Sequence, residues 1–198
     1  MKASASDQRS ILDIQKFDFQ SATLRNKAAN LPELAEINSL TIKQNNARDL
    51  RIAAETELSD VKRELARAEG DVEQIVTRIE RDEKRLSSGT GTPKELEQTQ
   101  HELVTLGARR AELEEVELEI MMRVDAIKER IADLSGQENQ LALEIADLNI
   151  RKENALAAIH TELEGIEADR KSTTQSVSTD FLALYEKIRE ANNGIGAA

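Results

Sequence analysis

The sequence predicts an all-α fold, a long antiparallel coiled-coil hairpin with a small helical base formed by the N-terminal and C-terminal helices. The main evidence is an apolar residue at eight consecutive positions spaced by seven: Leu106, Leu113, Ile120, Ile127, Leu134, Leu141, Leu148 and Ala155. A second apolar row lies on the same grid, interrupted by polar residues such as Arg110 and Glu138. A period of 3.5 residues keeps one stripe facing a partner helix over the whole length.

The composition supports long solvated helices and excludes several classes of function. Charged residues make up 33% of the 198 residues and aromatic residues only 2%, as in an elongated molecule with little interior. The net charge of -11 disfavours binding of nucleic acid by the whole surface, because neutralising phosphates requires clustered Lys and Arg. The absence of cysteine excludes disulfides and thiolate metal sites from this sequence. We expect a cytoplasmic protein, because neither a signal-peptide run nor a membrane-spanning apolar window is present.

The N-terminal half predicts a base helix over residues 1–30 and a first coiled-coil arm over 32–86. Asp7 or Ser6 is the expected N-cap of the base helix. Leu31-Pro32 should interrupt the chain, because proline lacks an amide donor and disfavours helix in the residue before it. Asp82 occupies one position of this arm where the heptad pattern predicts an apolar residue. The apolar positions of this arm are Leu58, Val61, Leu65, Ala68, Val72, Ile75, Ile79 and Leu86.

The segment 87–93 predicts the hairpin turn, because it concentrates serine, glycine and threonine before Pro93. A second arm should then cover residues 94–171. Folding the arms about this turn pairs residues whose numbers sum to about 181 or 182, such as Val61 with Ile120 and Leu58 with Val124. The same register predicts ion pairs between the two arms, with Lys62, Arg63 and Arg67 near Glu119 and Glu114.

The C-terminal part predicts a base helix over residues 177–192 and a tail over 193–198. A polar stretch over 172–176 separates this helix from the second arm. A hairpin brings both chain ends to the end opposite its turn, so the terminal helices can pack together. We therefore expect the core of the base to contain all four aromatic residues of the chain, which are Phe17, Phe19, Phe181 and Tyr185.

The motifs indicate surfaces for contact and no chemistry. Gly89-Thr90-Gly91 lacks the preceding strand and the Lys-Ser or Lys-Thr of a phosphate-binding loop, so we interpret it as a turn. No metal site or cofactor is expected, because His101 and His160 have no second ligand at helical spacing. We predict no enzyme, because long helices offer no cleft for a catalytic set. The exposed tip is a candidate partner contact, through Gly89, Thr90, Gly91, Thr92 and Lys94, and the sequence leaves open whether a partner binds at the tip or at the base.

Several stretches resemble bacterial C4-type zinc-ribbon proteins that carry an N-terminal coiled-coil hairpin. They are ILDIQKFD (11–18) with LPE (31–33), SGT (88–90) with TPKEL (92–96), the helical stretch that begins at residues 100–103 and ends at residues 117–121, and LYEKIR (184–189). In that family a glycine-containing stretch like NGIGAA (193–198) leads into two CxxC pairs that hold a structural zinc. This sequence stops before such pairs, so either the ribbon has been removed or this member lacks one. None of the ribbon's metal or nucleic-acid residues has a counterpart here.

The resemblance implies a non-enzymatic adaptor that positions a zinc-ribbon head and mediates protein–protein interaction, in a family linked to transcription and secretion machinery. A structural zinc is expected only if a CxxC…CxxC ribbon follows. The alternative is direct nucleic-acid binding or RNA chaperoning through basic residues near the base, which are Arg9, Lys16, Arg25 and Lys27. A hairpin that grips client proteins ranks last, because its tip is polar. One intramolecular partner satisfies a seam of two rows, so we expect a monomer and leave dimerisation through the base open.

Overall fold

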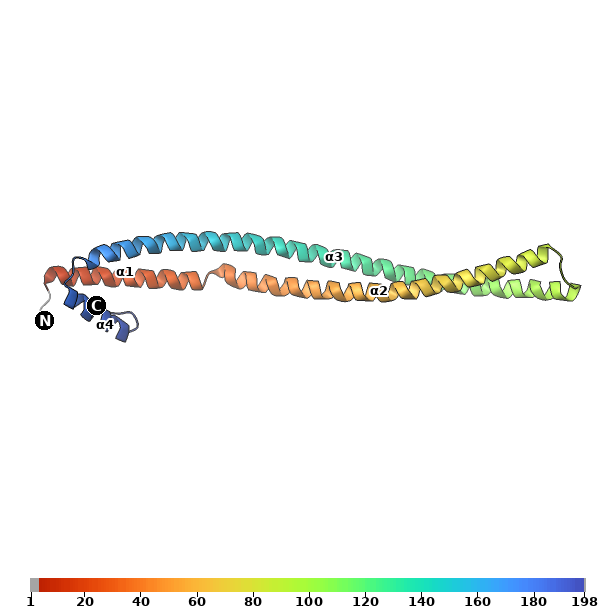
Figure 1. The fold of residues 1–198 in the computed structure, drawn as a ribbon, viewed down its shortest axis with the longest axis horizontal. Coiled ribbons are helices and arrows are strands. Elements are labelled where there is room, and N and C mark those ends of the chain that lie inside the picture. Colours follow the sequence, from red (N-terminus) through yellow and green to blue (C-terminus); the bar gives the residue numbers. More distant parts are fainter. Residues whose placement is uncertain (1–3, 198) are drawn as a thin grey trace. The chain divides into compact units, whose positions relative to one another are not determined.

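The computed structural model describes residues 4–197, and in that range the chain is helical apart from short connections (Figure 1). The helices are α1 (Ala5–Ala29), α2 (Pro32–Ser87), α3 (Pro93–Thr174) and α4 (Thr179–Ala191). The chain divides into two compact units, a base unit of Met1–Ile42 with Ala142–Ala198 and a hairpin unit of Lys43–Leu141. The predicted all-α hairpin fold is confirmed. Among the described residues, no helix has a stretch apolar enough to span a membrane.

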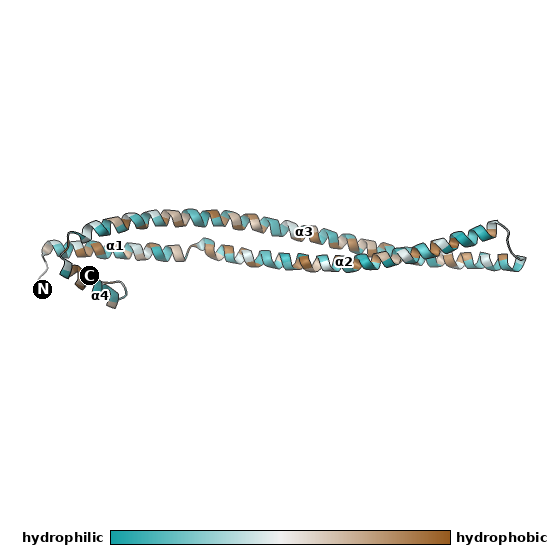
Figure 2. Ribbon diagram, in the orientation of Figure 1, coloured by the Kyte–Doolittle hydropathy of each residue, from teal (hydrophilic) through white to brown (hydrophobic). Residues whose placement is uncertain are grey.

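The seam of the hairpin unit joins α2 and α3 through the apolar rows that the heptad pattern predicts. Ala54, Val61, Val124 and Ile127 form its buried cluster, and Leu58, Leu65, Ile120 and Ile131 pack against it. Val61 and Val124 are members of this cluster, and Leu58 and Ile120 pack against it, so all four residues of the predicted pairs lie in the seam. Figure 2 shows apolar and polar residues alternating along both helices, as expected for helices with one face against a partner.

The buried row of α2 contains small residues that the sequence pattern did not reveal. Ala47, Ala54, Val61 and Ala68 recur at intervals of seven and are all buried. The larger apolar residues of α2 predict a seam that begins at Leu58, so Ala47 and Ala54 are not predicted as part of it. Alanine carries a weak hydrophobic signal, yet its small side chain leaves room for the facing helix. The seam therefore begins earlier in α2 than the larger apolar residues suggest.

Ion pairs flank this seam, although their partners differ from the predicted ones. Arg63 pairs with Asp60 and Glu114 pairs with Arg110, each within its own helix, so the predicted cross-helix contacts of Arg63 and Glu114 are wrong. A partner three or four residues away is in reach without spanning the seam. The cross-helix pairs are Arg51–Glu138 at 3.0 Å, Glu64–Arg123 at 2.9 Å, Glu57–Arg130 and Arg78–Glu102.

Asp82 is a charged residue in the seam near the turn. Its side chain is 18% exposed, and its Oδ2 atom is buried without a hydrogen-bond partner, with Arg78 Nε 4.0 Å away. A desolvated carboxylate oxygen without a donor destabilises the folded state. The register derived from the sequence places Asp82 opposite Thr99, which is also buried.

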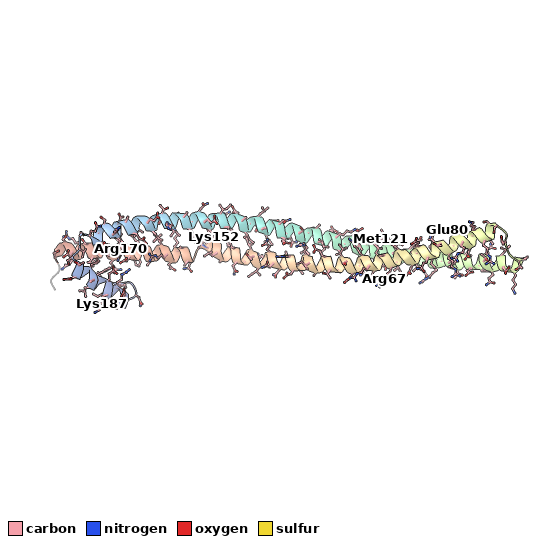
Figure 3. The ribbon with its side chains drawn as sticks, viewed as in Figure 1. Arg67, Glu80, Met121, Lys152, Arg170 and Lys187 are labelled. Carbon is pink, nitrogen blue, oxygen red and sulfur yellow. The ribbon has the colours of Figure 1, made fainter. Side chains whose placement is uncertain are left out.

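Replacing Asp82 with leucine should raise the free energy of unfolding by about 1–2 kcal/mol, because it removes the unsatisfied oxygen and extends the apolar seam. Thermal unfolding followed by circular dichroism measures the change. The matched control is Glu80→Leu, which makes a similar replacement at an exposed position of the same helix (labelled in Figure 3) and should change stability by less than about 0.5 kcal/mol. Equal effects of the two variants would contradict the assignment of Asp82 to the seam.

The base unit has its own small core between α1 and the C-terminal segment. Ile11, Ile14, Val177 and Tyr185 form the buried cluster, and Phe181, Leu182 and Ala197 pack against it. Two of the predicted core aromatics are therefore in place, and Phe17 is half-buried. The prediction is wrong for Phe19, which is 70% exposed. Phe19 follows the fully buried Ile14 by five residues, about 140° around the helix, so it cannot share the inward face of Ile14.

The ends of α1 differ slightly from the prediction. Ser4, and neither Ser6 nor Asp7, is the N-cap: its Oγ accepts a hydrogen bond from the Asp7 amide at 3.0 Å. At the other end the amide of Asn30 donates to the carbonyls of Asn26 and Lys27. Leu31 interrupts the helix and is 6% exposed, and α2 begins at Pro32. The Leu31-Pro32 break is therefore where the sequence places it.

Candidate functional site

The tip of the hairpin unit is a tight turn between α2 and α3. Gly89 and Gly91 have φ values of 64° and 146°, a backbone region that side chains other than glycine rarely adopt. Thr92 caps α3: its Oγ1 accepts a hydrogen bond from the Glu95 amide at 3.4 Å, and its own amide and hydroxyl donate to Glu95 Oε2 at 2.7 and 3.0 Å. These hydrogen bonds from Thr92 lower the pKa of Glu95. Both glycines and Thr92 thus stabilise the conformation of the turn.

All five predicted tip residues are exposed, but they differ in what they can offer a partner. Thr92 is engaged by Glu95, and Thr90 Oγ1 lies 2.9 Å from Ser88 Oγ in a hydrogen bond. Lys94 forms no ion pair with any residue in the described part of the chain. Among the five, Lys94 and Thr90 are therefore the side chains that a partner can reach without dismantling the cap.

The base unit contains a polar network that joins α1, α3 and α4 around Asp18. Arg170 donates from Nε to Asp18 Oδ1 at 2.7 Å and from Nη2 to Glu186 at 2.6 Å (Arg170 is labelled in Figure 3). Arg189 lies 3.3 Å from Asp18 Oδ1, and the Tyr185 hydroxyl donates to Asp18 Oδ2 at 2.7 Å. The side chain of Asp18 is only 9% exposed. One nearly buried carboxylate therefore ties three helices together.

The environment of Asp18 keeps the network in one protonation state. Burial alone would raise the pKa of Asp18, but hydrogen bonds from Arg170 and Tyr185 and the charges of both arginines lower it below its usual value of 3.8. Burial and the hydrogen bond to Asp18 raise the pKa of Tyr185. The carboxylate is thus ionised and the phenol neutral at physiological pH, and both are fully engaged in holding the base together.

Gln15 clamps the segment that follows α4. Its Nε2 donates to the carbonyl of Gly194 at 3.0 Å, and its Oε1 accepts from the amides of Gly196 and Ala197 at 2.6 and 3.2 Å. Gly196 passes close to Tyr185: a Cβ atom at residue 196 would overlap the Tyr185 ring and lie 2.9 Å from its carbonyl oxygen. The segment therefore needs glycine at this position to reach the clamp.

An open cleft of about 710 Å³ lies beside this network within the base unit. It is bordered by α1, the last turns of α3, Arg189 of α4 and the segment Asn193–Ile195. Its more exposed lining residues include Phe19, Arg25 and Ile195, whereas Ser21, Asp18 and Arg170 are its more buried ones. The cleft thus combines apolar and cationic side chains at its rim.

The predicted basic contacts of the base do not form one surface. Arg9, Lys16 and Lys27 are exposed and follow one another at spacings of seven and eleven residues, about two and three turns, so they share a stripe of α1. Arg25 lies on the opposite side, where its Nη2 is 3.2 Å from Glu167 of α3, and it alone of the four lines the cleft. Sequence reasoning missed Gln15, Asp18, Arg170 and Arg189, because their pairing joins distant parts of the chain.

The described residues offer little for metal or acid–base chemistry. In the range 4–197, no three His, Asp or Glu side chains are grouped so as to hold a metal ion. His160 contacts Glu164 at 3.4 Å on the exposed surface of α3. Asp18, Arg170 and Tyr185, whose pKa values are shifted by their mutual contacts, are also the residues that hold α1, α3 and α4 together.

Comparison with known proteins agrees with this architecture. The model of the CT398-like coiled-coil hairpin domain matches residues 14–193, nearly the whole chain. The chain belongs to the CT398-like coiled-coil hairpin family. The uncharacterized protein Rv2229c of Mycobacterium tuberculosis is 31% identical over 201 residues, which cover 100% of this chain and 80% of that protein. The hairpin part of the expected resemblance is thereby confirmed.

Solved structures show the same fold. A protein from Mycobacterium smegmatis is 26% identical with a TM-score of 0.80, and the match covers 96% of this chain and 79% of that one. CT398 from Chlamydia trachomatis is 15% identical with a TM-score of 0.63 over the same shares, a likeness of fold alone. These matches establish the CT398-like hairpin fold. They give no support for membership of a C4-type zinc-ribbon family.

Proposed function

We propose that this chain is a non-enzymatic coiled-coil scaffold that mediates protein–protein interaction through its base and its tip. The observation that carries the proposal is Phe19, a large aromatic side chain that is 70% exposed beside the cleft of the base unit. Aromatic residues are enriched at protein interfaces. Leu184 and Ile188 of α4 are also exposed, at 42% and 38%. The base thus presents apolar side chains that its own core does not use.

Site-specific photo-crosslinking in cells tests this function. A crosslinking amino acid is placed at Leu184 in the base, at Lys94 in the tip and at Glu80 on the arm, all of which are exposed. We expect one identified protein to be captured from the base position, from the tip position or from both. It should not be captured from Glu80. Capture from neither end, or equal capture from Glu80, would contradict a scaffold with localised contact surfaces.

The tip contact can be tested without disturbing the cap of α3. Thr90→Glu combined with Lys94→Glu changes the two available side chains and leaves Thr92 and Glu95 in place. If the tip is a contact surface, partner capture in a quantitative pull-down should fall by about tenfold or more, equivalent to about 1.4 kcal/mol. Lys43→Glu, an exposed reversal elsewhere in the hairpin unit, is the control. Unchanged capture by the tip variant would show that the tip is not used.

A zinc-ribbon head positioned by this scaffold is the further part of the proposal, and the sequence resemblance supports it. Such a head would hold structural zinc through two CxxC pairs, the usual ligand set of a ribbon. The gene sequence beyond the codon for Ala198 decides the matter. Two CxxC pairs would support the head, and a stop codon would contradict it. The cytoplasmic location and the monomeric state stay predictions.

A further inference from the structure

The cleft of the base unit carries more positive than negative side chains, in contrast to the chain as a whole. Its lining includes Arg25, Arg170, Lys171 and Arg189 but only two carboxylates, Asp18 and Glu167, whereas the chain has a net charge of -11. Side chains of one charge that line a cleft attract and orient a ligand of the opposite charge. A ligand that enters this cleft is therefore more favourably anionic than cationic.

Two of the four cations are available to such a ligand. Arg170 and Arg189 are held by Asp18 and by Glu186, which approaches from α4 and does not line the cleft. Arg25 pairs with Glu167, but the two side chains are 67% and 60% exposed, and an exposed pair contributes little. Lys171 has no ion pair with any residue between 4 and 197. Arg25 and Lys171 can thus exchange solvent or a weak partner for a ligand carboxylate.

The apolar part of the cleft favours a peptide over a small inorganic anion. Phe19 and Ile195 both line it and are 70% and 58% exposed. Phe19 also borders a second, shallower hollow of about 290 Å³ lined by residues of α1 and α3, among them Leu24 and Ile166. An aromatic ring standing between two hollows can be covered by an apolar side chain of a partner, and burial of that surface favours binding.

We propose that this cleft binds an acidic peptide segment of a partner protein, with its carboxylates on Arg25 and Lys171 and an apolar side chain against Phe19 and Ile195. This inference rests on the proposed function, because it specifies the partner of the base surface. The occupant is defined by charge complementarity together with the exposed aromatic. Neither feature alone would select it, since a cationic patch attracts any anion.

Fluorescence anisotropy with the full chain tests the proposal. The probes are short labelled peptides rich in Asp and Glu with one Leu, Phe or Trp, the same peptides with the apolar residue changed to Ser, and the same peptides with Lys replacing the acids. We expect binding of the first set, binding about tenfold weaker or worse for the second, and no binding of the third. Equal binding of all three sets, or none by the first set at low salt, overturns the proposal.

Matched variants place the binding in the cleft. Arg25→Glu with Lys171→Glu should weaken binding by about tenfold or more, whereas Lys16→Glu with Lys27→Glu makes the same change in net charge on the other stripe of α1 and should have little effect. Circular dichroism establishes that both double variants are folded. Equal weakening by the two would show unspecific attraction and overturn the proposal. Displacement of the peptide by a single-stranded oligonucleotide that binds more tightly through the same residues would also overturn it.

The peptide experiment and the crosslinking experiment fail separately. If no acidic peptide binds but a protein is still captured from Leu184, the scaffold function stands and its partner has other chemistry. If acidic peptides bind through Arg25 and Lys171 while no protein is captured in cells, the cleft has its ligand class but the scaffold function is wrong.

Discussion

Replacing Asp18 with alanine should release α4 from α1 and α3 and lower the free energy of unfolding of the base unit by about 2–3 kcal/mol. The reason is that Arg170, Arg189 and the Tyr185 hydroxyl all use this one carboxylate. Its removal leaves partly buried donors and charges without their acceptor. Hydrogen exchange of the α4 amides, compared with amides of the hairpin unit, measures the local effect.

The Asp18 contribution should depend on pH in a defined direction. Because the pKa of Asp18 is lower in the folded protein than its ordinary value of 3.8, the stabilisation is present above about pH 3.8 and is lost as the pH falls through the lower folded value. Asp18→Asn should therefore flatten the acid limb of the stability curve of the base. Tyr185→Phe, which removes one donor and keeps the ionised carboxylate, should leave most of that limb in place. An Asp18→Asn curve that superimposes on the wild-type curve would refute this account.

Replacing Gly196 with valine should detach the segment after α4 and lower stability by about 1–3 kcal/mol, because the new side chain would overlap the Tyr185 ring. The amides of residues 196 and 197 would lose their bonds to Gln15 Oε1 and exchange faster. Hydrogen exchange of the C-terminal peptide provides the measurement.

Two further variants separate the steric effect from the clamp. Gln15→Ala removes the hydrogen bonds without adding bulk, so it should accelerate the same amides with a smaller loss of stability. Gly165→Ala lies in helix α3 with open space around its Cβ, so it should be neutral or stabilising by about 1 kcal/mol. Protected C-terminal amides in both Gly196→Val and Gln15→Ala would show that the clamp does not hold this segment.

The fold could be predicted from the sequence because its arms repeat one local rule. A heptad pattern is visible within one helix, and the breaks at Leu31-Pro32 and before Pro93 follow from backbone chemistry. The alanine row of α2 was missed because Ala47 and Ala54 look neutral on a hydrophobicity scale, although both are buried. The heptad pattern thus predicts which helices pair but not the full length of the seam between them.

The base site could not be predicted to the same depth, because its contacts join residues far apart in the sequence. Asp18 and Arg170 are 152 positions apart, and neither stands out locally among so many charged residues. The aromatic residues located the base correctly, but their presence in the terminal helices did not determine which faces they occupy. Their clustering predicts Phe19 in the core, whereas its position on the helix places it outside.

The cross-helix ion pairs of the hairpin unit bear on how this protein can transmit a change. Their polarity varies along the seam: α2 contributes the cation at Arg51 and the anion at Glu57 and Glu64. A slide of α3 by one heptad would place Arg51 opposite Ile131 instead of Glu138. Such a slide also separates Glu64 from Arg123. The same slide brings Arg123 opposite Glu57, so two of these three pairs lose their charged partner and one re-forms. The cross-helix ion pairs therefore favour the observed alignment over one shifted by a heptad.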